Sequence, residues 1–356
     1  MSSSPVRLAF IGLGGMGQVA HLRNYVLDPG VTVVAAAELR PELGRRVCER
    51  YGIPRLYPDH RELLEKEEVD GIVAIQQFTR HGQIVPELLK QGVPILTEKP
   101  LARSWEVGSG ILKAAQAART PLYVAYHKRS DPAVIHARKI MAGWRQNGEF
   151  GRLKYIRLTM PPGGWPSPST GYDPMLRTDE PYPELERDPH GTGLDEKAVA
   201  RLDAFVNYYI HQVNLMRHLM GEDYSVSYAD PAGVVLGVNS VSGVSGTLEM
   251  APYQSASEWQ EQAFIAFEKA NIRVDIPGPL TADAAGRVTV FRDRFDGTPP
   301  ETLSPSLPPV HAMRQQAIHF ADALRGNPTP LCRAEEALKD LQTAREYMDL
   351  FLKTTT

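Results

Sequence analysis

Three glycines near the start of the chain follow the spacing Gly-x-Gly-x-x-Gly. Residues 12–17 read Gly-Leu-Gly-Gly-Met-Gly, and they lie between the apolar run Val6–Ile11 and a stretch with helical spacing. In such a strand-to-helix turn the first glycine makes the tight bend and the second lets the backbone approach a pyrophosphate. The third lets the helix and the strand pack closely. The positive end of the helix then faces the phosphates, so we expect the loop to bind a dinucleotide. The expected contacts come from Gly12, Gly14, Gly15, Met16 and Gly17.

An acidic residue, Glu38, stands about 20 residues further on, at the end of the second β-branched run, Val31–Ala37. A carboxylate at this place accepts hydrogen bonds from the adenosine ribose hydroxyls and repels the extra phosphate of NADP. It therefore predicts NAD as the cofactor. Arg40 is close by and can pair with that phosphate, so NADP remains an alternative.

A third group with chemical potential is Glu98-Lys99-Pro100, directly after the run Val93–Thr97. Ligands of open α/β sheets bind outside the carboxyl ends of the strands. A lysine at such an end can reach the nicotinamide edge and a substrate hydroxyl, whereas elsewhere it would be a solvated surface lysine. Pro100 stiffens the turn and is a candidate for a cis peptide bond.

Two patterns of elements must position these groups. Up to residue 126, short buried strands alternate with amphipathic helices, which predicts an α/β Rossmann domain with a parallel sheet over residues 1–126. Later strands are bunched together, which predicts an α+β domain with an open, largely antiparallel mixed sheet over 127–310. We expect one helix over Ala198–Met220, and C-terminal helices in 311–356 that pack back between the domains.

Four features together resemble the Gfo/Idh/MocA family of NAD(P)-dependent sugar and polyol oxidoreductases. The resemblance covers nearly the whole chain, and its features are the glycine loop, Thr97–Pro100, Ala125–Pro132 and the helix carrying His211. It implies a Rossmann domain followed by an open sheet, and a homo-oligomer, dimer or tetramer, formed through that sheet.

The resemblance also implies roles for individual residues. Lys99 and His211 would be catalytic, and the family commonly has an Asp four residues before the histidine. This chain has Asn207 there, which can hydrogen-bond the imidazole but brings no charge. On one continuous helix the two side chains would lie one turn apart. His211 could otherwise be a core or supporting histidine.

Further positions are implied near the cofactor and the substrate. The additional cofactor contacts are Gln76, His81, Glu98 and Lys99, and the substrate contacts are His127, Lys128, Trp165, Asn207 and His211. His81 could equally be a structural residue at a helix N-terminus, and Arg129 is more readily explained as a structural ion pair.

The irregular stretch 161–196 is rich in proline, glycine and acidic residues, and it contains Trp165, Tyr172 and Tyr182. Aromatic faces with hydrogen-bonding neighbours suit a sugar ring, although a solvated acidic loop would have a similar composition. Three potential ligands also occur here or nearby, Asp173, His190 and Asp195, but no ligand spacing supports a metal site.

Composition narrows the protein class. The formal net charge of −3 argues against a general nucleic-acid partner. No apolar run of roughly 20 residues is present, so we expect no membrane partner, and the N-terminus lacks a signal-peptide pattern. Two distant cysteines, Cys48 and Cys332, exclude a disulfide framework and are compatible with a cytoplasmic protein.

The sequence therefore predicts an NAD-dependent oxidoreductase that transfers hydride between nicotinamide and a hydroxyl or ketone of a sugar, polyol or glycoside. Two alternatives stay open. One is an enzyme that uses bound NAD for transient oxidation during glycoside cleavage or elimination. The other is a dinucleotide-binding regulatory protein without turnover, against which the presence of both Lys99 and His211 argues.

Overall fold

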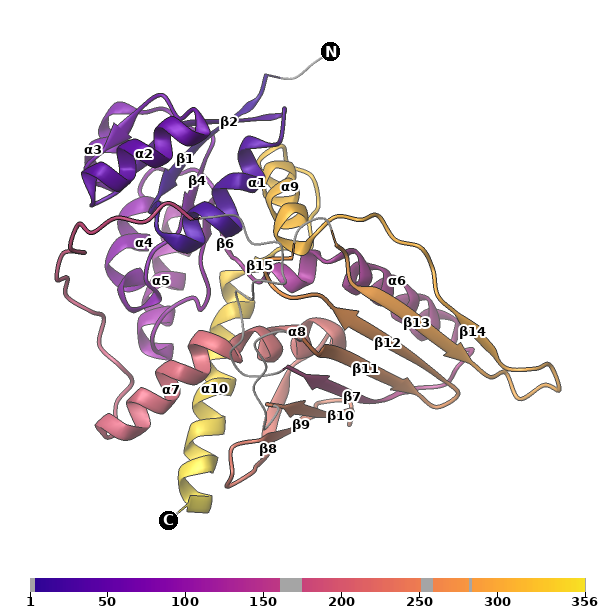
Figure 1. Ribbon diagram of the computed structural model, residues 1–356. Helices are drawn as coiled ribbons and strands as arrows, with labels where there is room; N and C mark the ends of the chain where they lie inside the picture. The colour runs from indigo at the N-terminus through magenta and orange to yellow at the C-terminus, as the bar shows by residue number, and fades with distance from the viewer. Residues whose placement is uncertain (1–3, 161–174, 251–258, 282–283, 356) are drawn as a thin grey trace. The chain divides into compact units, whose positions relative to one another are not determined.

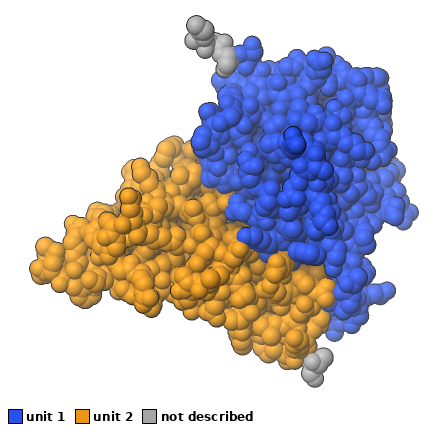
Figure 2. All heavy atoms as spheres, turned by 180° about the vertical axis from the view of Figure 1, so that it is seen from behind, with its two compact units in different colours: residues 1–126, 173–199, 316–341 blue, residues 127–172, 200–315, 342–356 orange. Residues whose placement is uncertain are grey.

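The computed structural model describes residues 4–160, 175–250, 259–281 and 284–355. The chain divides into two compact units, which are coloured separately in Figure 2. The Rossmann unit comprises residues 1–126, 173–199 and 316–341, and the sheet unit comprises residues 127–172, 200–315 and 342–356. The predicted fold class is confirmed in both units.

The Rossmann unit is built on a sheet with the strand order β15-β6-β5-β4-β1-β2-β3. Its strands are parallel except for β15, which pairs antiparallel with β6 at one edge. The strands are β1 (Val6–Ile11), β2 (Val31–Ala37), β3 (Leu56–Tyr57), β4 (Gly71–Ala74), β5 (Ile95–Thr97), β6 (Leu122–Val124) and β15 (Cys332–Arg333). Burial of β1, β2, β4, β5 and β6 explains their nearly continuous apolar character.

Helices connect these strands, and local sequence sets several of their ends. Pro41 begins α2, which ends at Gly52 in the left-handed conformation. Asp59 and Ser104 cap the first turns of α3 and α5 with their side chains. The bounds are η1 (Gly17–Leu22), α1 (Arg23–Val26), α2 (Pro41–Tyr51), α3 (His60–Lys66), η2 (Phe78–Arg80), α4 (His81–Leu89), α5 (Trp105–Ala118), α9 (Ala312–Leu324) and α10 (Ala334–Thr355).

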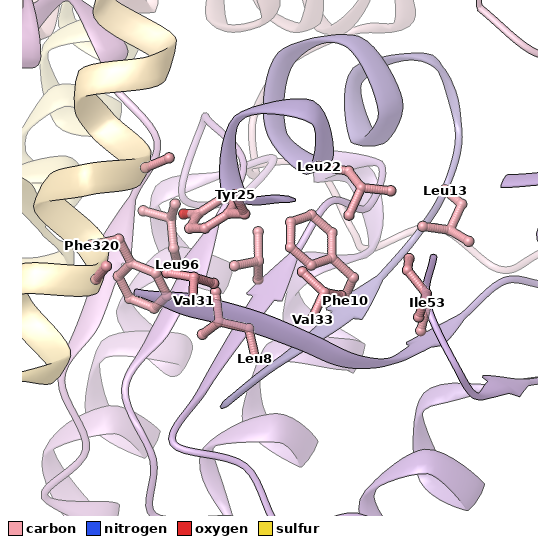
Figure 3. Packing of buried hydrophobic residues seen from close by; sticks show 14 of the residues in the cluster. Leu8, Phe10, Leu13, Leu22, Tyr25, Val31, Val33, Ile53, Leu96 and Phe320 are labelled. Carbon is pink, nitrogen blue, oxygen red and sulfur yellow. The ribbon is translucent and has the colours of Figure 1, made fainter. Parts of the chain in front are cut away.

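The core of the Rossmann unit joins the two ends of the sequence. Figure 3 shows Phe10 and Tyr25 packed beside Phe320 of α9. The Tyr25 ring lies edge-on to Phe10, with 5.3 Å between centroids, and edge-on to Phe320 at 6.4 Å. Tyr123 of β6 also contacts the Phe320 ring, at 6.1 Å. Residues near position 320 therefore complete a core that begins at β1.

The sheet unit contains an eight-stranded sheet in the order β14-β13-β12-β11-β7-β10-β9-β8. All its pairings are antiparallel except that of β7 with β10. Its strands are β7 (Leu153–Thr159), β8 (Tyr224–Ala229), β9 (Val235–Ser240), β10 (Ser245–Glu249), β11 (Glu261–Phe267), β12 (Ala270–Ile276), β13 (Arg287–Arg292) and β14 (Glu301–Leu303). Strict alternation of buried and half-buried residues along β11 indicates one covered and one open face.

Two features differ from the sequence-based expectations. The helix expected over Ala198–Met220 is interrupted at Tyr209, giving α7 (Glu196–Tyr208) and α8 (Ile210–Met220). Neighbouring bulky rings crowd this point, since Tyr209 contacts both Tyr208 and Phe205.

The second difference concerns the grouping of segments. Residues 173–199 group with the Rossmann unit rather than with the second domain, because their hydrogen bonds reach its helices. In the C-terminal segment 311–356, residues 316–341 belong to the Rossmann unit, whereas residues 311–315 and 342–356 belong to the sheet unit. Among the described residues, no helix is long and apolar enough to cross a membrane.

Candidate functional site

The glycine loop has the conformation that close approach to a phosphate requires. Gly12 has φ +99°, and a Cβ there would meet the Ile75 carbonyl. A Cβ on Gly17 would meet the Gly12 carbonyl, so both positions exclude side chains. At Gly14, by contrast, a Cβ would come no nearer than 3.6 Å to the Arg40 guanidinium. The backbone is thus open at the second glycine, and a dinucleotide pyrophosphate fits the loop.

The helix after the loop starts with the π-turn η1, and π-turns occur frequently at functional sites. Its Gln18 is buried and donates through Nε2 to the Leu13 carbonyl at 2.9 Å. The Gln18 backbone N–H bonds the Gly14 carbonyl at 3.0 Å. This side chain therefore fixes the shape of the loop from inside the fold.

Glu38 lies where the sequence predicts a ribose-binding carboxylate. It is 5% exposed, and its Oε2 accepts from the backbone N–H of Leu13 in the glycine loop, at 2.8 Å. Its Oε1 accepts from the Arg40 side chain, Nε, at 2.7 Å. The Arg40 backbone N–H donates to the same Oε1 at 3.2 Å. A carboxylate has about four acceptor positions, so one remains for a ribose hydroxyl. These contacts keep the carboxylate next to the loop.

The Lys99 turn follows β5, and its Lys99–Pro100 peptide bond is cis, as predicted. The preceding Glu98 is buried, accepts from His21 Nε2 at 2.7 Å, and accepts from the Lys99 backbone N–H at 2.9 Å. Burial alone raises the pKa of Glu98, but the His21 hydrogen bond and the charges of His21 and Lys99 bring it below its usual value. The helix after the glycine loop is thus joined to the turn that carries the lysine.

His81 is fully buried and braces the same turn. Its Nδ1 lies 3.1 Å from the Pro100 carbonyl and 3.2 Å from that of Leu101, and its Nε2 lies 3.3 Å from the Gln76 carbonyl. Burial lowers the pKa of this imidazole, which favours the neutral form. Of the two interpretations left open by the sequence, these backbone contacts favour the structural one.

The described part of the 161–196 stretch runs against the Rossmann unit. We call residues 175–190 the crossing segment. Leu176 exchanges two hydrogen bonds with Gln18, its N–H donating at 3.0 Å and its carbonyl accepting at 3.1 Å. Further along, Asp188 accepts from the Gly82 N–H at the start of α4, at 2.7 Å. Trp165 and Tyr172, which the sequence proposed for sugar stacking, lie outside the described residues.

Three histidine rings meet in the sheet unit. His127 follows β6, and its ring lies edge-on to His211 of α8, with 5.0 Å between centroids. On its other side it stacks on His311, at 6.5 Å. His127 is buried, whereas His211 is half-buried. The structure therefore brings together two residues that the sequence proposed for the substrate site, and it adds His311.

Lys128, the next predicted substrate contact, is 2% exposed and is bound to Glu261 of β11 at 2.7 Å. The same carboxylate accepts from Gln212 at 2.7 Å and from the Trp259 indole at 3.1 Å. Burial raises the pKa of Glu261, against the opposing charge and hydrogen bond of Lys128. These contacts are those of a buried structural ion pair.

Asn207 lies at the exposed end of α7, before the break at Tyr209, while His211 belongs to α8. Tyr209, which separates the two helices, keeps a helical backbone conformation, with φ −78° and ψ −5°. The expected meeting of the Asn207 and His211 side chains stays a prediction. Within the described residues, no group of three or more His, Cys, Asp or Glu side chains could hold a metal ion. Lys99 is half-buried and belongs to the Rossmann unit, whereas His211 belongs to the sheet unit.

Comparison with known proteins assigns the Rossmann part of the chain. Residues 6–126 match the family model described as "Oxidoreductase family, NAD-binding Rossmann fold", the Gfo/Idh/MocA model. The chain is 24% identical over 246 residues to myo-inositol 2-dehydrogenase of Thermotoga maritima, covering 69% of this chain and 63% of that protein. Residues 6–126 thus form a Rossmann domain of the Gfo/Idh/MocA type. The Rossmann unit is accordingly the part that binds the nicotinamide dinucleotide, NAD or NADP.

Two further similarities were found, one to a protein sequence and one to a solved structure. The scyllo-inositol 2-dehydrogenase (NAD(+)) of Bacillus subtilis is 25% identical over 219 residues, covering 61% of this chain and 55% of that protein. The matches to both inositol dehydrogenases thus cover less than two thirds of those proteins. An NAD-binding oxidoreductase structure from Klebsiella pneumoniae has a TM-score of 0.73 at 15% identity, covering 99% of this chain and 98% of that one. This last likeness concerns the fold.

Several residues that hold the predicted positions in place were missed by sequence reasoning. The most informative are Gln18, His21, Glu180, Asp188 and Glu261. Gln18 and His21 could have been suspected, since they lie one and four residues after the last loop glycine, on the first turns of the helix. The three acidic residues, Glu180, Asp188 and Glu261, bind partners that lie more than 100 residues away in the sequence. No local spacing indicates such pairings.

Proposed function

We propose that this protein is an NAD-dependent dehydrogenase or reductase. It would act on a hydroxyl-bearing carbon of a sugar, polyol or glycoside, or on the corresponding ketone. The observation that carries the proposal is the His21–Glu98 hydrogen bond at 2.7 Å. It ties the helix after the glycine loop to the turn that presents Lys99, so cofactor binding and a proton-transferring group share one rigid framework.

The division of labour follows from general chemistry. Bound NAD supplies hydride acceptance and donation at its nicotinamide ring. The chain itself must orient the substrate hydroxyl and hold or move its proton. We assign proton acceptance and orientation to His211, with Lys99 providing electrostatic support and a proton relay. An imidazole and a lysine side chain are both groups that can take part in such a proton transfer.

The substrate class is proposed from the relatives named above, which are inositol dehydrogenases by description. A panel of inositols, aldoses, polyols and glycosides with NAD and with NADP, followed at 340 nm, tests it. We expect NADH formation with at least one cyclic polyol or sugar. Tightly retained NAD and turnover without net absorbance change would replace the proposal by transient oxidation. Inertness toward the whole panel would favour a regulatory role.

The choice of NAD over NADP is proposed from the buried Glu38 carboxylate beside the loop. Titration of the wild-type protein with both dinucleotides tests this choice. Glu38→Ser should reduce the difference in affinity between NAD and NADP. Tighter binding of NADP by the wild type would show that Arg40 governs the site.

We also propose a cytoplasmic homo-oligomer, a dimer or tetramer formed through the open face of the eight-stranded sheet. Two free, buried cysteines, Cys48 and Cys332, support a reducing compartment. Partly exposed aromatic residues on the sheet, Phe264 and Phe291, support the interface. Light scattering after size exclusion tests the assembly, and a monomeric mass at micromolar concentration would overturn it.

A further inference from the structure

The N-terminus of α2 is occupied by a carboxylate from a distant part of the chain. α2 starts directly after the Glu38–Arg40 turn, and its first residue, Pro41, has no N–H. The next two backbone N–H groups, of Glu42 and Leu43, donate to the two oxygens of Glu180 at 3.0 and 2.9 Å. The crossing segment thus satisfies the donors that the first turn of α2 presents.

Glu180 is held in this position by its own segment. The Thr178 hydroxyl donates to Glu180 Oε2 at 3.1 Å, and the Glu180 N–H donates back to the same hydroxyl at 3.1 Å. The backbone N–H groups of α2, helped by the Thr178 hydroxyl and the nearby charge of Arg40, lower the pKa of Glu180. The carboxylate is therefore anionic at neutral pH.

The segment is fastened to the Rossmann unit on both sides of Glu180. Leu176 and Gln18 bond each other in both directions before it, and Arg46 donates to the Arg177 carbonyl at 2.8 Å. Asp188 bonds the Gly82 N–H after it. Figure 1 draws this part of the chain as an extended trace that precedes α7. Glu180 is thus a fixed group of the unit.

Arg40, the other group that could receive a phosphate here, is also engaged. Its Nε donates to Glu38 at 2.7 Å, and its guanidinium lies over the Tyr182 ring, 5.2 Å from the centroid. A 2′-phosphate on the adenosine ribose is bound by an arginine near the end of the second strand, and helix N-termini attract such anions. In this protein both features are already used by internal groups.

We propose that Glu180 acts as a built-in substitute for the 2′-phosphate of NADP and thereby makes the site selective for NAD. An incoming 2′-phosphate would meet two carboxylates, Glu38 and Glu180, and would have to displace the second from α2. NAD carries no such phosphate and leaves the arrangement intact. The inference rests on the proposed preference for NAD and adds a second selecting residue, which lies 142 positions from Glu38 in the sequence (38 against 180).

Equilibrium binding to the purified full-length protein tests this without any turnover. NAD, NADP and the fragment 2′,5′-ADP are titrated by calorimetry against wild type, Glu180→Ser and the double variant Glu38→Ser/Glu180→Ser. Glu180→Ser should tighten NADP and 2′,5′-ADP about tenfold, because one full charge and one competitor for the α2 donors are removed. NAD affinity should stay within about twofold. The double variant should bind NADP and 2′,5′-ADP more tightly still. The two effects should not be additive, since the two positions are neighbours.

Glu184→Ser is the matched control, since Glu184 is an exposed glutamate of the same segment. It should leave both affinities unchanged. If the wild type already prefers NADP, the proposed cofactor choice fails, whatever Glu180 does. If the wild type prefers NAD but Glu180→Ser binds NADP no better than Glu184→Ser does, the inference is overturned. Equal weakening of NAD and NADP would also overturn it, because the segment would then only position the dinucleotide as a whole.

Discussion

Two lysines follow neighbouring strands of the same parallel sheet and have opposite surroundings. Lys99 comes after β5 and is half-buried, at a turn whose rigidity comes from Glu98, His21 and His81. Lys128 comes after β6, where its ammonium is buried against the Glu261 carboxylate. The first lysine is positioned by its neighbours and retains solvent-facing surface. Lys128 instead holds its surroundings in place through its ion pair with Glu261.

The difference shows that residue type and topological position together do not assign a role. The carboxyl end of a parallel strand is a favourable place for chemistry, and both lysines are there. What separates them is the partner, because a buried ammonium with a carboxylate at 2.7 Å is committed to the fold. Variants of the two turns should therefore fail in different ways.

Lys128→Met should have the largest effect, and it should act on stability. Removal of the ammonium leaves Glu261 buried without its counter-charge, which costs about 3–5 kcal/mol of unfolding free energy. Urea denaturation followed by circular dichroism measures this, with Lys139→Met, at an exposed lysine, as the control. The double variant Lys128→Met/Glu261→Gln should recover part of the loss. If Lys128→Met is as stable as the control, the two lysines do not differ as described.

Lys99→Ala should lower turnover by roughly 100-fold or more, the size of a lost proton-transfer group. Its urea midpoint and its NAD affinity should change little, since the buried contacts of the turn are made by Glu98 and His81. Initial rates at 340 nm on a substrate found in the panel measure the effect, and Lys90→Ala removes an exposed lysine for comparison. Near-normal turnover would take Lys99 out of the mechanism.

Asp131, three residues after Lys128, gives a prediction about pH. Burial raises its pKa from 3.8 to about 6, although the hydrogen bonds it accepts from the N–H groups of Ala133 and Gly286 act in the opposite direction. Between these values the folded chain keeps a proton that the unfolded chain has released. Stability should therefore fall as pH rises from about 4 to 6, by roughly 2–3 kcal/mol.

Asp131 is also the N-cap of α6 (Pro132–Asn147). Asp131→Asn removes the titration but keeps the cap, because asparagine also caps helices well. Between pH 4 and 6, the urea midpoint of the variant should change less with pH than that of the wild type. Parallel profiles for the two proteins would mean that Asp131 does not set this pH dependence. The experiment sharpens the contrast with the Lys99 turn, where the pKa of Glu98 is lowered instead.

His211→Ala should lower kcat by about 100-fold, the lower end expected for a lost proton acceptor, with NAD affinity preserved. A shared role with Lys99 limits the loss. In Asn207→Asp, the added carboxylate should move the acidic limb of the kcat/KM profile to higher pH if His211 is the base, and much less if Lys99 is the base. A clear shift of that limb to higher pH would show that the two side chains communicate. Wild-type kcat in His211→Ala would leave His211 as a packing residue.

Local sequence predicted a large part of the fold because the signals that define the elements are short-range. The strands Val6–Ile11 and Val31–Ala37 have the bounds of the apolar runs in the sequence, since β-branched residues favour strands through their immediate neighbours. The helix break at Tyr209 was missed because helical spacing continues through it, and only packing of the aromatic rings reveals it.

The site was predictable to the extent that a single turn encodes it. The glycine loop, Glu38 and the cis bond before Pro100 each depend on a few consecutive residues. The bonds of Glu180 to α2 and of Glu261 to Lys128 depend on which distant segments the fold brings into register. A lone glutamate in an acidic stretch carries no sign of such a partner.

The Rossmann unit is assembled from three separate stretches of the chain, and the last of them ends at residue 341. During synthesis the first 126 residues leave the ribosome long before Phe320 and β15 exist, so the nascent unit lacks part of its core and its edge pairing with β6. The N-terminal domain therefore cannot finish folding before residues 316–341 have been synthesised. The exposed β6 edge is a place where a chaperone would act, or where chains would associate wrongly, until residues 316–341 have been synthesised.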